Sequence, residues 1–325
     1  VAPSSNQTFA LLPPSRWCDL SHRHNRRNSM LYQVISGRFL NAPVTLAATT
    51  GTNHAIQNHS TSGTFVINGD VTSSTTSAGT TILQLQGTNT TANAINGNIS
   101  DNTSGSILAI TKNTGAGAWV LSGGNTYTGA TTVSVGTLLV NGTHNGGSAN
   151  GYTVGATGIL GGTGAITTAS VTTAAGSKLV PGGTGIAEDL SFTLASGASA
   201  MDVSLSSNDS GAYLFDLAAP SASDKVVLAL GALNIGSMTN SDFVFTELSG
   251  FSNGTYVLFD ASSAITGSVT SALNSISFTG GRTGTLSLDA LNNNVLLTVV
   301  PEPTTWALLA FSLTSIMVLR RRRAR

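Results

Sequence analysis

Short runs in which apolar and polar residues alternate fill much of the chain between residues 63 and 300. Residues 242–248 and 284–288 are examples, and residues 64–67, 81–85 and 107–110 are further short runs, rich in β-branched residues and bounded by Gly, Asn or Ser. Such runs predict short β-strands separated by turns. The same region has too few Lys, Glu and Arg residues to give helices a charged face. We therefore expect an all-β protein whose strands begin at about Gly63.

A glycine followed closely by an apolar residue recurs along the middle of the chain. The pairs are Gly136 with Leu138, Gly158 with Leu160, Gly176 with Leu179, and Gly197 with Met201. The sequence Gly-Gly-Thr-Gly also occurs twice, at residues 161–164 and 182–185. A period of about 20 residues predicts a β-solenoid, in which each coil stacks the same apolar residue on its predecessor. A β-sandwich is the alternative, but it requires no fixed period.

Residues 121–140 hold two apolar runs around the turn Gly-Asn-Thr-Tyr-Thr-Gly, and a third run follows a glycine. This stretch resembles the autotransporter-associated β-strand repeat. The residues that carry the resemblance are Gly124, Asn125, Thr126, Tyr127, Gly129, Gly136 and Leu138. The resemblance implies a right-handed parallel β-helix of the kind found in autotransporter passengers, with weaker coils from about residue 95 to residue 200.

The end of the chain combines a proline-containing box, an apolar run and a cluster of arginines. The box is Pro301, Glu302 and Pro303. The apolar run, residues 306–319, contains Trp306, Leu308, Leu309, Phe311, Leu313, Ile316, Met317, Val318 and Leu319. The arginines are Arg320, Arg321, Arg322, Arg323 and Arg325.

A single short transmembrane helix is the expected structure of this tail. The apolar run is shorter than the roughly 20 residues of a full bilayer span. A helix buried in the protein core is the alternative, but five arginines cannot follow it into a core without partners. Arginines that follow an apolar helix hold its end on the cytoplasmic side.

The tail resembles the PEP-CTERM sorting signal of bacterial surface proteins. The resemblance implies export, capture in the inner membrane, and cleavage near residues 301–303 by an exosortase, a membrane sorting enzyme. The exosortase and the inner membrane, the latter transiently, are therefore expected partners, and the mature protein is expected at the cell surface or outside the cell.

Four segments are expected along the chain. Residues 1–62 are a disordered or misassigned leader, residues 63–200 the β-solenoid, residues 201–300 a β-rich or sandwich-like cap, and residues 301–325 the sorting signal. Phenylalanine, tyrosine and aspartate become frequent after residue 201, and a solenoid needs cover at its open end. In the leader, Cys18, His22 and His24 are candidate metal or nucleic-acid ligands, but an unstructured arm holds no preorganised site.

Charge is distributed unevenly. Between residues 39 and 300 there are Lys112, Lys178, Lys225 and Arg282 against twelve Asp and Glu residues, which gives a net charge of −8 (4 − 12). An acidic body excludes nucleic acid as the expected partner, because phosphate binding requires clustered basic residues. Cys18 is the only cysteine, so neither an intramolecular disulfide nor a cysteine metal cluster can form.

Few ionisable residues are available for catalysis in the predicted solenoid. They are Asp101, Lys112, Lys178, Glu188 and Asp189. Glycosidases and polysaccharide lyases need such groups to converge in one groove. The adjacent pair Glu188 and Asp189 would point to opposite faces of a strand.

Metal and cofactor sites are equally hard to find in the sequence. The two Gly-Gly-Thr-Gly runs lack the aspartate of calcium-binding repeats, and His54, His59 and His144 are isolated. We expect no cofactor, no catalytic residue and no metal site. The expected function is that of a non-enzymatic structural protein of the cell surface or extracellular matrix. The alternatives are a carbohydrate-binding adhesin, with extracellular polysaccharide as its partner, and a polysaccharide lyase or hydrolase on a β-helix.

Overall fold

The structure is a computed structural model that describes residues 21–25, 29–34, 38–46, 53–61, 63–74, 78–147, 149–183, 185–196, 199–204 and 210–302, with side chains from residue 39 onward. The described chain is built from β-strands and one 3-10 helix, η2 (Asn240–Asp242). The strands form an 18-stranded, a nine-stranded and a two-stranded sheet. The expectation of an all-β protein is confirmed.

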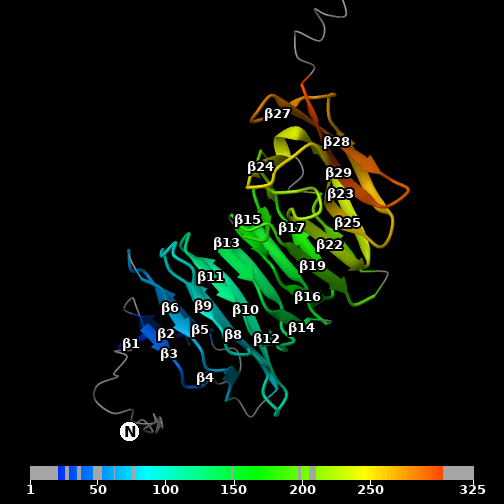
Figure 1. Cartoon of the computed structure of the whole chain (residues 1–325). Coiled ribbons are helices and arrows are strands. Elements are labelled where there is room, and N and C mark those ends of the chain that lie inside the picture. The colour runs from blue at the N-terminus through cyan, green and yellow to red at the C-terminus, as the bar shows by residue number, and fades with distance from the viewer. Residues whose placement is uncertain are drawn as a thin grey trace, which may run out of the picture.

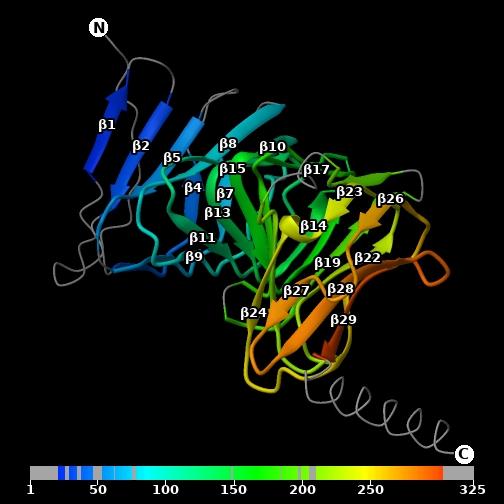
Figure 2. The same cartoon turned by 90° about the horizontal axis from the view of Figure 1, so that it is seen from above.

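Parallel pairing between strands far apart in sequence organises the chain into three ladders. The first ladder contains β1 (Ser21–Asn25), β2 (Ser29–Val34), β5 (Asn53–Asn58), β8 (Gly79–Gln86), β10 (Ser106–Thr114), the first half of β13 (Thr131–Val140), the first half of β15 (Tyr152–Gly162), β17 (Val171–Thr173), β20 (Ala200–Asp202), β23 (Ala232–Thr239) and β26 (Ile265–Thr270). All of these pairings are parallel except that of β1 with β2. Figure 2 shows β1, β2, β5 and β8 side by side.

The second ladder contains β3 (Arg38–Leu40), β6 (Phe65–Ile67), β9 (Asn93–Ile95), β11 (Ala118–Leu121), the second halves of β13 and β15, β18 (Lys178–Pro181), β21 (Tyr213–Leu217) and β24 (Phe243–Glu247). Because β13 and β15 each run through both ladders, the two ladders join in the 18-stranded sheet. The bend in β13 falls at Gly136, whose φ of 76° lies in the left-handed region that favours glycine.

The third ladder begins with β4 (Val44–Leu46) and β7 (Val71–Ser73), and a single bridge to Ile99 continues it. Its later members are β12 (Gly124–Asn125), β14 (Thr143–Gly147), β16 (Ala165–Thr168), β19 (Asp189–Leu194), β22 (Lys225–Leu230) and β25 (Gly254–Ala261). One strand or segment from each ladder makes a coil, and the described residues form nine coils, from β2–β3–β4 to β23–β24–β25. Figure 1 shows them stacked in chain order. This arrangement of parallel sheets is typical of a β-helix.

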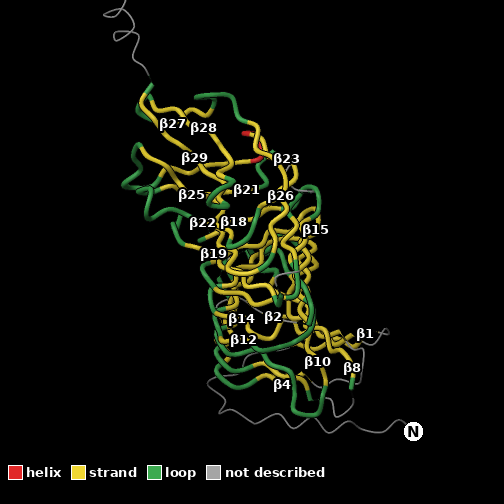
Figure 3. The backbone as a smooth tube through the Cα atoms, turned by 90° about the vertical axis from the view of Figure 1, so that its right-hand side faces the viewer, coloured by secondary structure: helices red, strands yellow, loops and turns green. Residues whose placement is uncertain are grey.

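An antiparallel unit closes the C-terminal end. Strand β29 (Asn294–Pro301) pairs antiparallel with β25, β28 (Arg282–Asp289) with β29, and β27 (Ile276–Phe278) with β28. Figure 3 places β27, β28 and β29 at the end of the molecule opposite β4. Parallel pairing continues past residue 200 before this unit begins, and the four-segment division of the chain stays a prediction.

The strands begin earlier than the sequence indicates. Strands β3, β4 and β5 precede Gly63, and each pairs in parallel with a strand of the following coil. These strands are only three to six residues long, and the apolar residues of β5 are Ala55 and Ile56, so the pattern of apolar positions did not reveal them. Residues 1–20, including Cys18, lie outside the described residues, and the side chains of His22 and His24 are not described.

The predicted leucine column is confirmed. Leu138 pairs in register with Leu160, and Leu160 with Leu179, and all three side chains are buried. The extension to Met201 is wrong, because Tyr213 follows Leu179 in the second ladder whereas Met201 lies in the first. The two Gly-Gly-Thr-Gly runs are also not equivalent, since residue 161 pairs with residue 180. Coil length varies, so equal spacing in sequence does not always mean equal position in the fold.

Candidate functional site

The coil that carries the predicted repeat is held to both of its neighbours by Asn125. The buried side chain accepts a hydrogen bond at Oδ1 from the N–H of Ile99, 3.0 Å away, in the preceding coil. Its Nδ2 donates to the carbonyl oxygens of Gly123 at 3.1 Å and of Thr143, in the following coil, at 3.2 Å. An amide has both a donor and an acceptor end, so one asparagine satisfies backbone groups in three successive coils.

Tyr127 begins a polar network inside the core. Its hydroxyl lies 2.7 Å from Thr131 Oγ1 and 3.3 Å from the hydroxyl of Tyr152. The imidazole of His144 stacks on the Tyr127 ring at a centroid distance of 4.0 Å. His144 Nε2 lies 2.8 Å from the carbonyl oxygen of Tyr127, and Nδ1 lies 2.7 Å from the Tyr152 hydroxyl.

The protonation of this network follows from its geometry. A carbonyl oxygen only accepts, so Nε2 of His144 carries the proton and Nδ1 accepts from Tyr152. Burial lowers the pKa of His144, and burial raises the pKa of Tyr127 to about 12. Both imidazole nitrogens are occupied and the side chain is buried, which makes the network a structural link within the core rather than a base that a solvent-borne substrate can reach.

The glycines of the repeat permit close approach of backbone and side chain. A Cβ on Gly129 would lie 2.3 Å from the carbonyl oxygen of Leu108, which is the acceptor of the Gly129 N–H at 3.0 Å. A Cβ on Gly136 would lie 2.7 Å from Nζ of Lys112. Both distances are too short for an alanine, so these two glycines are required by packing.

Lys112 is buried inside the solenoid. Its ammonium donates to the carbonyl oxygens of Thr114 at 3.2 Å, Gly115 at 2.7 Å and Val135 at 2.9 Å. Burial lowers its pKa to about 8. Three carbonyl oxygens use the three donors of the ammonium, so the contacts place Lys112 in a structural role at the corner next to Gly136.

Asp101 binds the turn of the repeat coil. Its carboxylate accepts the N–H of Leu108 at 2.7 Å, the N–H of Thr128 at 3.1 Å, and the hydroxyl of Thr128 at 2.5 Å. These contacts join the corner before β10 to the turn after β12. Asp101 is therefore occupied by the fold. It follows Ile99 at the end of the third coil, whereas Glu188 and Asp189, at the start of β19, lie in the seventh.

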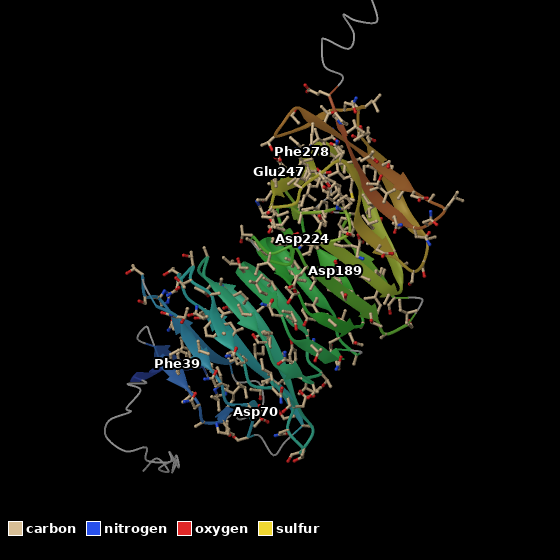
Figure 4. All side chains as sticks on the ribbon, in the orientation of Figure 1. Phe39, Asp70, Asp189, Asp224, Glu247 and Phe278 are labelled. Carbon is tan, nitrogen blue, oxygen red and sulfur yellow. The ribbon has the colours of Figure 1, made fainter. Side chains whose placement is uncertain are left out.

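Two buried carboxylates hold the loop that precedes β19. Asp216, in β21, accepts the N–H groups of Gly185 and Ile186, the latter at 3.1 Å. Asp224 accepts the N–H of Glu188 at 2.8 Å and the N–H of Asp216 at 2.7 Å. We call this arrangement the carboxylate-held loop. Figure 4 shows Asp189 and Asp224 in the C-terminal half of the molecule, far from Phe39 and Asp70.

Burial raises the pKa of Asp224 to about 8, although its two N–H donors favour the charged form. The loop also passes close to this carboxylate, because a Cβ on Gly182 would lie 2.4 Å from Asp224 Oδ1. The Asp224 carboxyl group is thus enclosed by backbone. Asp224 therefore serves as a hydrogen-bond acceptor that holds the backbone of the loop in place.

A surface ion cluster lies beside the loop. Lys225 Nζ is 3.4 Å from Asp189 and 3.7 Å from Asp260, and all three side chains are partly exposed. Glu188 is exposed at the end of the loop. Asp189 is therefore the one of the five ionisable residues considered for catalysis that has a described ion pair, and Glu188 precedes it in sequence. Among the described residues, no group of three or more His, Cys, Asp or Glu side chains is placed to hold a metal ion.

The predicted sorting signal begins where the folded body ends. Pro301 is the last residue of β29 and pairs with Arg282, and the N–H of Glu302 donates to the carbonyl oxygen of Gly281 at 2.7 Å. Pro303, the apolar residues from Trp306 to Leu319 and the arginines from Arg320 to Arg325 lie outside the described residues. Within the part that is described, no helix has the length and apolar character needed to cross a membrane.

The comparison with protein families agrees with the position of the repeat. Residues 113–140 match a family model described as the passenger-associated-transport-repeat, an autotransporter-associated repeat. The match contains β11, β12 and β13, and with them Asn125, Tyr127 and Gly136. Repeats of this type indicate an exported, surface-associated, β-rich protein. No curated protein matches the chain.

Sequence reasoning missed the polar links of the core. The network of Tyr127, His144 and Tyr152 joins residues up to 25 positions apart, and Asp216 and Asp224 act on a loop in the preceding coil. The spacing of apolar residues gave no signal for the network, because Tyr152 pairs in register with Thr131 and the two tyrosines do not occupy equivalent positions in successive coils.

Proposed function

We propose that the protein is a non-enzymatic structural component of the bacterial cell surface or extracellular matrix. It is a right-handed β-solenoid stalk with a β-rich cap, exported and sorted through its C-terminal tail. The observation that carries this proposal is the repeat coil itself, because its chemically distinctive residues are all used in holding coils together. Asn125, Tyr127 and Lys112 direct their polar atoms to neighbouring coils rather than to solvent.

The position of the Pro-Glu-Pro box supports sorting by cleavage. The box begins at Pro301, where β29 ends, and Pro301 and Glu302 are exposed. Prolines disfavour a helix and keep a segment extended, as a protease site requires. A cut after Glu302 would leave every described strand of the cap in place. An exosortase is the proposed sorting enzyme and the inner membrane the proposed transient location.

Mass spectrometry of the protein isolated from its own host tests this proposal. We expect a mature C-terminus near residue 300 and no peptide that contains Arg325. Mature surface protein that retains Arg325 would rule out sorting by cleavage. The stalk function is tested separately, with a panel of neutral and acidic polysaccharides: turnover of any of them would overturn a non-enzymatic role.

Glycan binding is a second candidate function, because one sheet presents a regular polar column. Thr111, Thr132, Thr153 and Thr172 pair in register on the outer side of the first ladder. Thr153 and Thr172 are exposed and the other two are half-buried. Hydroxyl groups repeated at the coil spacing of about 4.8 Å suit an extended polysaccharide. Retention on the same panel without turnover, and its loss in Thr153→Val, would favour an adhesin.

A further inference from the structure

Six asparagines of the chain are each followed directly by a glycine. They are Asn68, Asn96, Asn141, Asn145, Asn150 and Asn253. Because glycine has no Cβ, its backbone nitrogen can reach the side-chain Cγ of the preceding asparagine and displace ammonia from it. This reaction requires an asparagine side chain that is free to turn and a glycine nitrogen that the fold does not hold. The structure separates the six pairs by these two requirements.

Three of the pairs lie at the corner between the second and the third ladder and fail both requirements. In each of them the glycine N–H donates to a carbonyl oxygen of the preceding coil at 3.0 to 3.4 Å, the glycines being Gly69, Gly97 and Gly142. The side chains are held as well. Asn96 Nδ2 donates to Asn68 Oδ1 at 2.8 Å, and Asn141 Oδ1 accepts the N–H of Thr163 at 3.4 Å. The coil must open before any of these pairs can react.

Two further pairs fail one requirement each. Asn150 Nδ2 donates to the carbonyl oxygen of Thr128 at 2.8 Å, which holds that side chain. The side chain of Asn253 is exposed and makes no hydrogen bond within the described part of the chain. The next residue, however, is Gly254, which begins β25 and pairs in register with Val299 of β29. The sheet therefore holds the backbone of this glycine.

Asn145 meets both requirements. Its side chain is exposed and has no hydrogen-bond partner among the described residues. Strands β14 and β16 pair in register up to His144 and again at Gly147. Asn145 and Gly146 lie between these positions, in a bulge, where the ladder is interrupted. On the other side β12 ends at Asn125, opposite His144. Neither neighbouring strand thus pairs with Gly146.

Packing keeps a glycine next to Asn145. A Cβ on Gly146 would lie 2.2 Å from the carbonyl oxygen of Tyr127 and 2.3 Å from that of Thr126. These distances are too short for any residue with a Cβ, so the coil requires glycine at this position. The residue type that makes the pair reactive is therefore fixed by the fold, while the asparagine side chain remains open to solvent.

We propose that Asn145 is a site of spontaneous deamidation in the folded protein. The nitrogen of Gly146 loses its proton and bonds to Cγ of Asn145, the bond from Cγ to Nδ2 breaks, and the amide leaves as ammonia with that proton. Water then opens the cyclic imide, at Cγ to give aspartate or at the main-chain carbonyl carbon to give isoaspartate. Either product has one more negative charge than the parent chain. The inference does not depend on the proposed function.

Peptide mapping of the full chain tests this site. The purified protein is kept at mildly alkaline pH, which favours loss of the proton from the glycine nitrogen, and mass spectrometry follows the conversion of each asparagine over time. The same chain unfolded in urea is the reference, because no pair is then held by the fold. We expect Asn145 to convert at similar rates in both samples. Asn141 is expected to convert at least about tenfold more slowly in the folded chain than in urea.

A variant links the charge change to this residue. Isoelectric focusing of the aged parent chain is expected to show a band shifted by one negative charge. The band should be lost in Asn145→Gln, because glutamine would have to form a six-membered ring and does so far more slowly. Asn141→Gln, which alters the corner pair of the same coil, is the matched control and is expected to keep the band. Circular dichroism checks that both variants remain folded β-proteins.

Three results would overturn the proposal. One is equal protection of Asn145 and Asn141 in the folded chain. Another is an acidic band that persists in Asn145→Gln, which would place the reaction at a different residue such as Asn253. The third is conversion of Asn145 to aspartate without isoaspartate, because direct hydrolysis of the amide gives aspartate alone and does not involve Gly146.

Discussion

The middle coils and the C-terminal coils solve the same packing problem with different residues. In the coils from β13 to β16 aliphatic residues stack in register in the core, such as Leu138 on Leu160, with Trp119 before them, and polar links such as Asn125 tie neighbouring coils together. In the coils from β21 to β25 the core is an aromatic cluster. It contains Tyr213, Phe215, Phe243, Phe245 and Phe259, with ring centroids 5.2 to 6.5 Å apart in the contacting pairs.

This difference shows how the C-terminal end of the solenoid is covered. A middle coil meets a similar coil above and below, so residues of similar size can stack in register, as Leu138 and Leu160 do. The last coils meet an antiparallel hairpin that does not repeat them, and Phe278 of β27 packs on Phe245 at 5.9 Å and on Phe251 at 5.0 Å. Large rings fill an irregular space with few side chains. A repeat therefore favours uniform residues, and a cap favours bulky ones.

The largest effect is expected where the aliphatic column is interrupted. Leu160→Asp places an unpaired charge between Leu138 and Leu179, and we expect it to lower the free energy of unfolding by about 3 to 5 kcal/mol. Urea unfolding measures this change, and hydrogen exchange is expected to show lost protection in the coils on both sides. Thr157→Asp, an exposed position on the same strand, is the control. A folded Leu160→Asp variant of normal stability would contradict the stacked column.

The aromatic cluster is expected to give a slightly smaller and more local effect. Phe215 is buried and contacts Phe243, Phe245 and Phe259, so Phe215→Ala should cost about 3 kcal/mol. Because each coil contacts only its neighbours, the loss of hydrogen-exchange protection should be confined to the C-terminal coils. Val244→Ala, on the exposed side of β24, should change little. Equal loss of protection at β8 and β10 would show that the two regions unfold as one.

The aliphatic column was predictable from sequence, and the aromatic cap only in part. Leu138, Leu160 and Leu179 follow glycines at near-constant spacing, so periodicity found them. Tyr213 continues the same column in the fold, but it follows Leu179 after a longer coil, which broke the spacing and pointed instead to Met201. Coil length is set by corner loops, which vary without disturbing the ladder.

Polar residues in the core were beyond a pattern of apolar positions. Asn93 lies in register between Phe65 and Trp119, where it accepts from Asn58 at 2.7 Å and donates to the carbonyl oxygen of Ala118 at 3.1 Å. An asparagine in an Asn-rich chain looks like a turn residue. Its hydrogen-bond partners come from the coils before and after its own, and no local sequence window contains them.

The carboxylate-held loop is expected to make stability depend on pH. With its pKa raised from 3.8 to about 8, Asp224 keeps its proton in the folded state where the unfolded chain has lost it. The folded state then binds more protons, so the free energy of unfolding falls as pH rises from about 4 to about 8. Urea unfolding at several pH values measures the slope, and Asp224→Asn should flatten it. An unchanged slope in Asp224→Asn would assign the pH dependence to other groups.

Asn125 tests the polar links of the middle coils. Asn125→Ala leaves the N–H of Ile99 and the carbonyl oxygen of Thr143 without their partner, and we expect a cost of about 2 kcal/mol. Its neighbour Thr126 is exposed, so Thr126→Ala is a matched control on the same turn and should be nearly neutral. Thermal or urea unfolding of both variants gives the comparison. Equal stability of the two would mean that water replaces the lost asparagine.

The smallest expected effect compares one contact that occurs in both regions. In the middle coils the hydroxyl and N–H of Thr128 donate to the carboxylate of Asp101, 27 residues away. In the cap the hydroxyl and N–H of Thr279 donate to the carboxylate of Glu247, 32 residues away. The first contact is partly buried and the second is exposed. Thr→Val removes only the hydroxyl donor in each case and keeps the shape of the side chain.

Burial decides how much each of these contacts contributes. A hydrogen bond to a charged group shielded from water is worth about 1.5 kcal/mol, so Thr128→Val should lower the free energy of unfolding by about that amount. Water competes for the exposed carboxylate of Glu247, and Thr279→Val should stay within about 0.5 kcal/mol of the parent. Urea unfolding of the two variants, with Thr128→Ser as a variant that keeps the donor, measures the difference. A larger loss of stability for Thr279→Val than for Thr128→Val would contradict this expectation. It would mean that the bond between Thr279 and Glu247 holds the C-terminal antiparallel unit on the solenoid, in addition to the contacts of its aromatic rings.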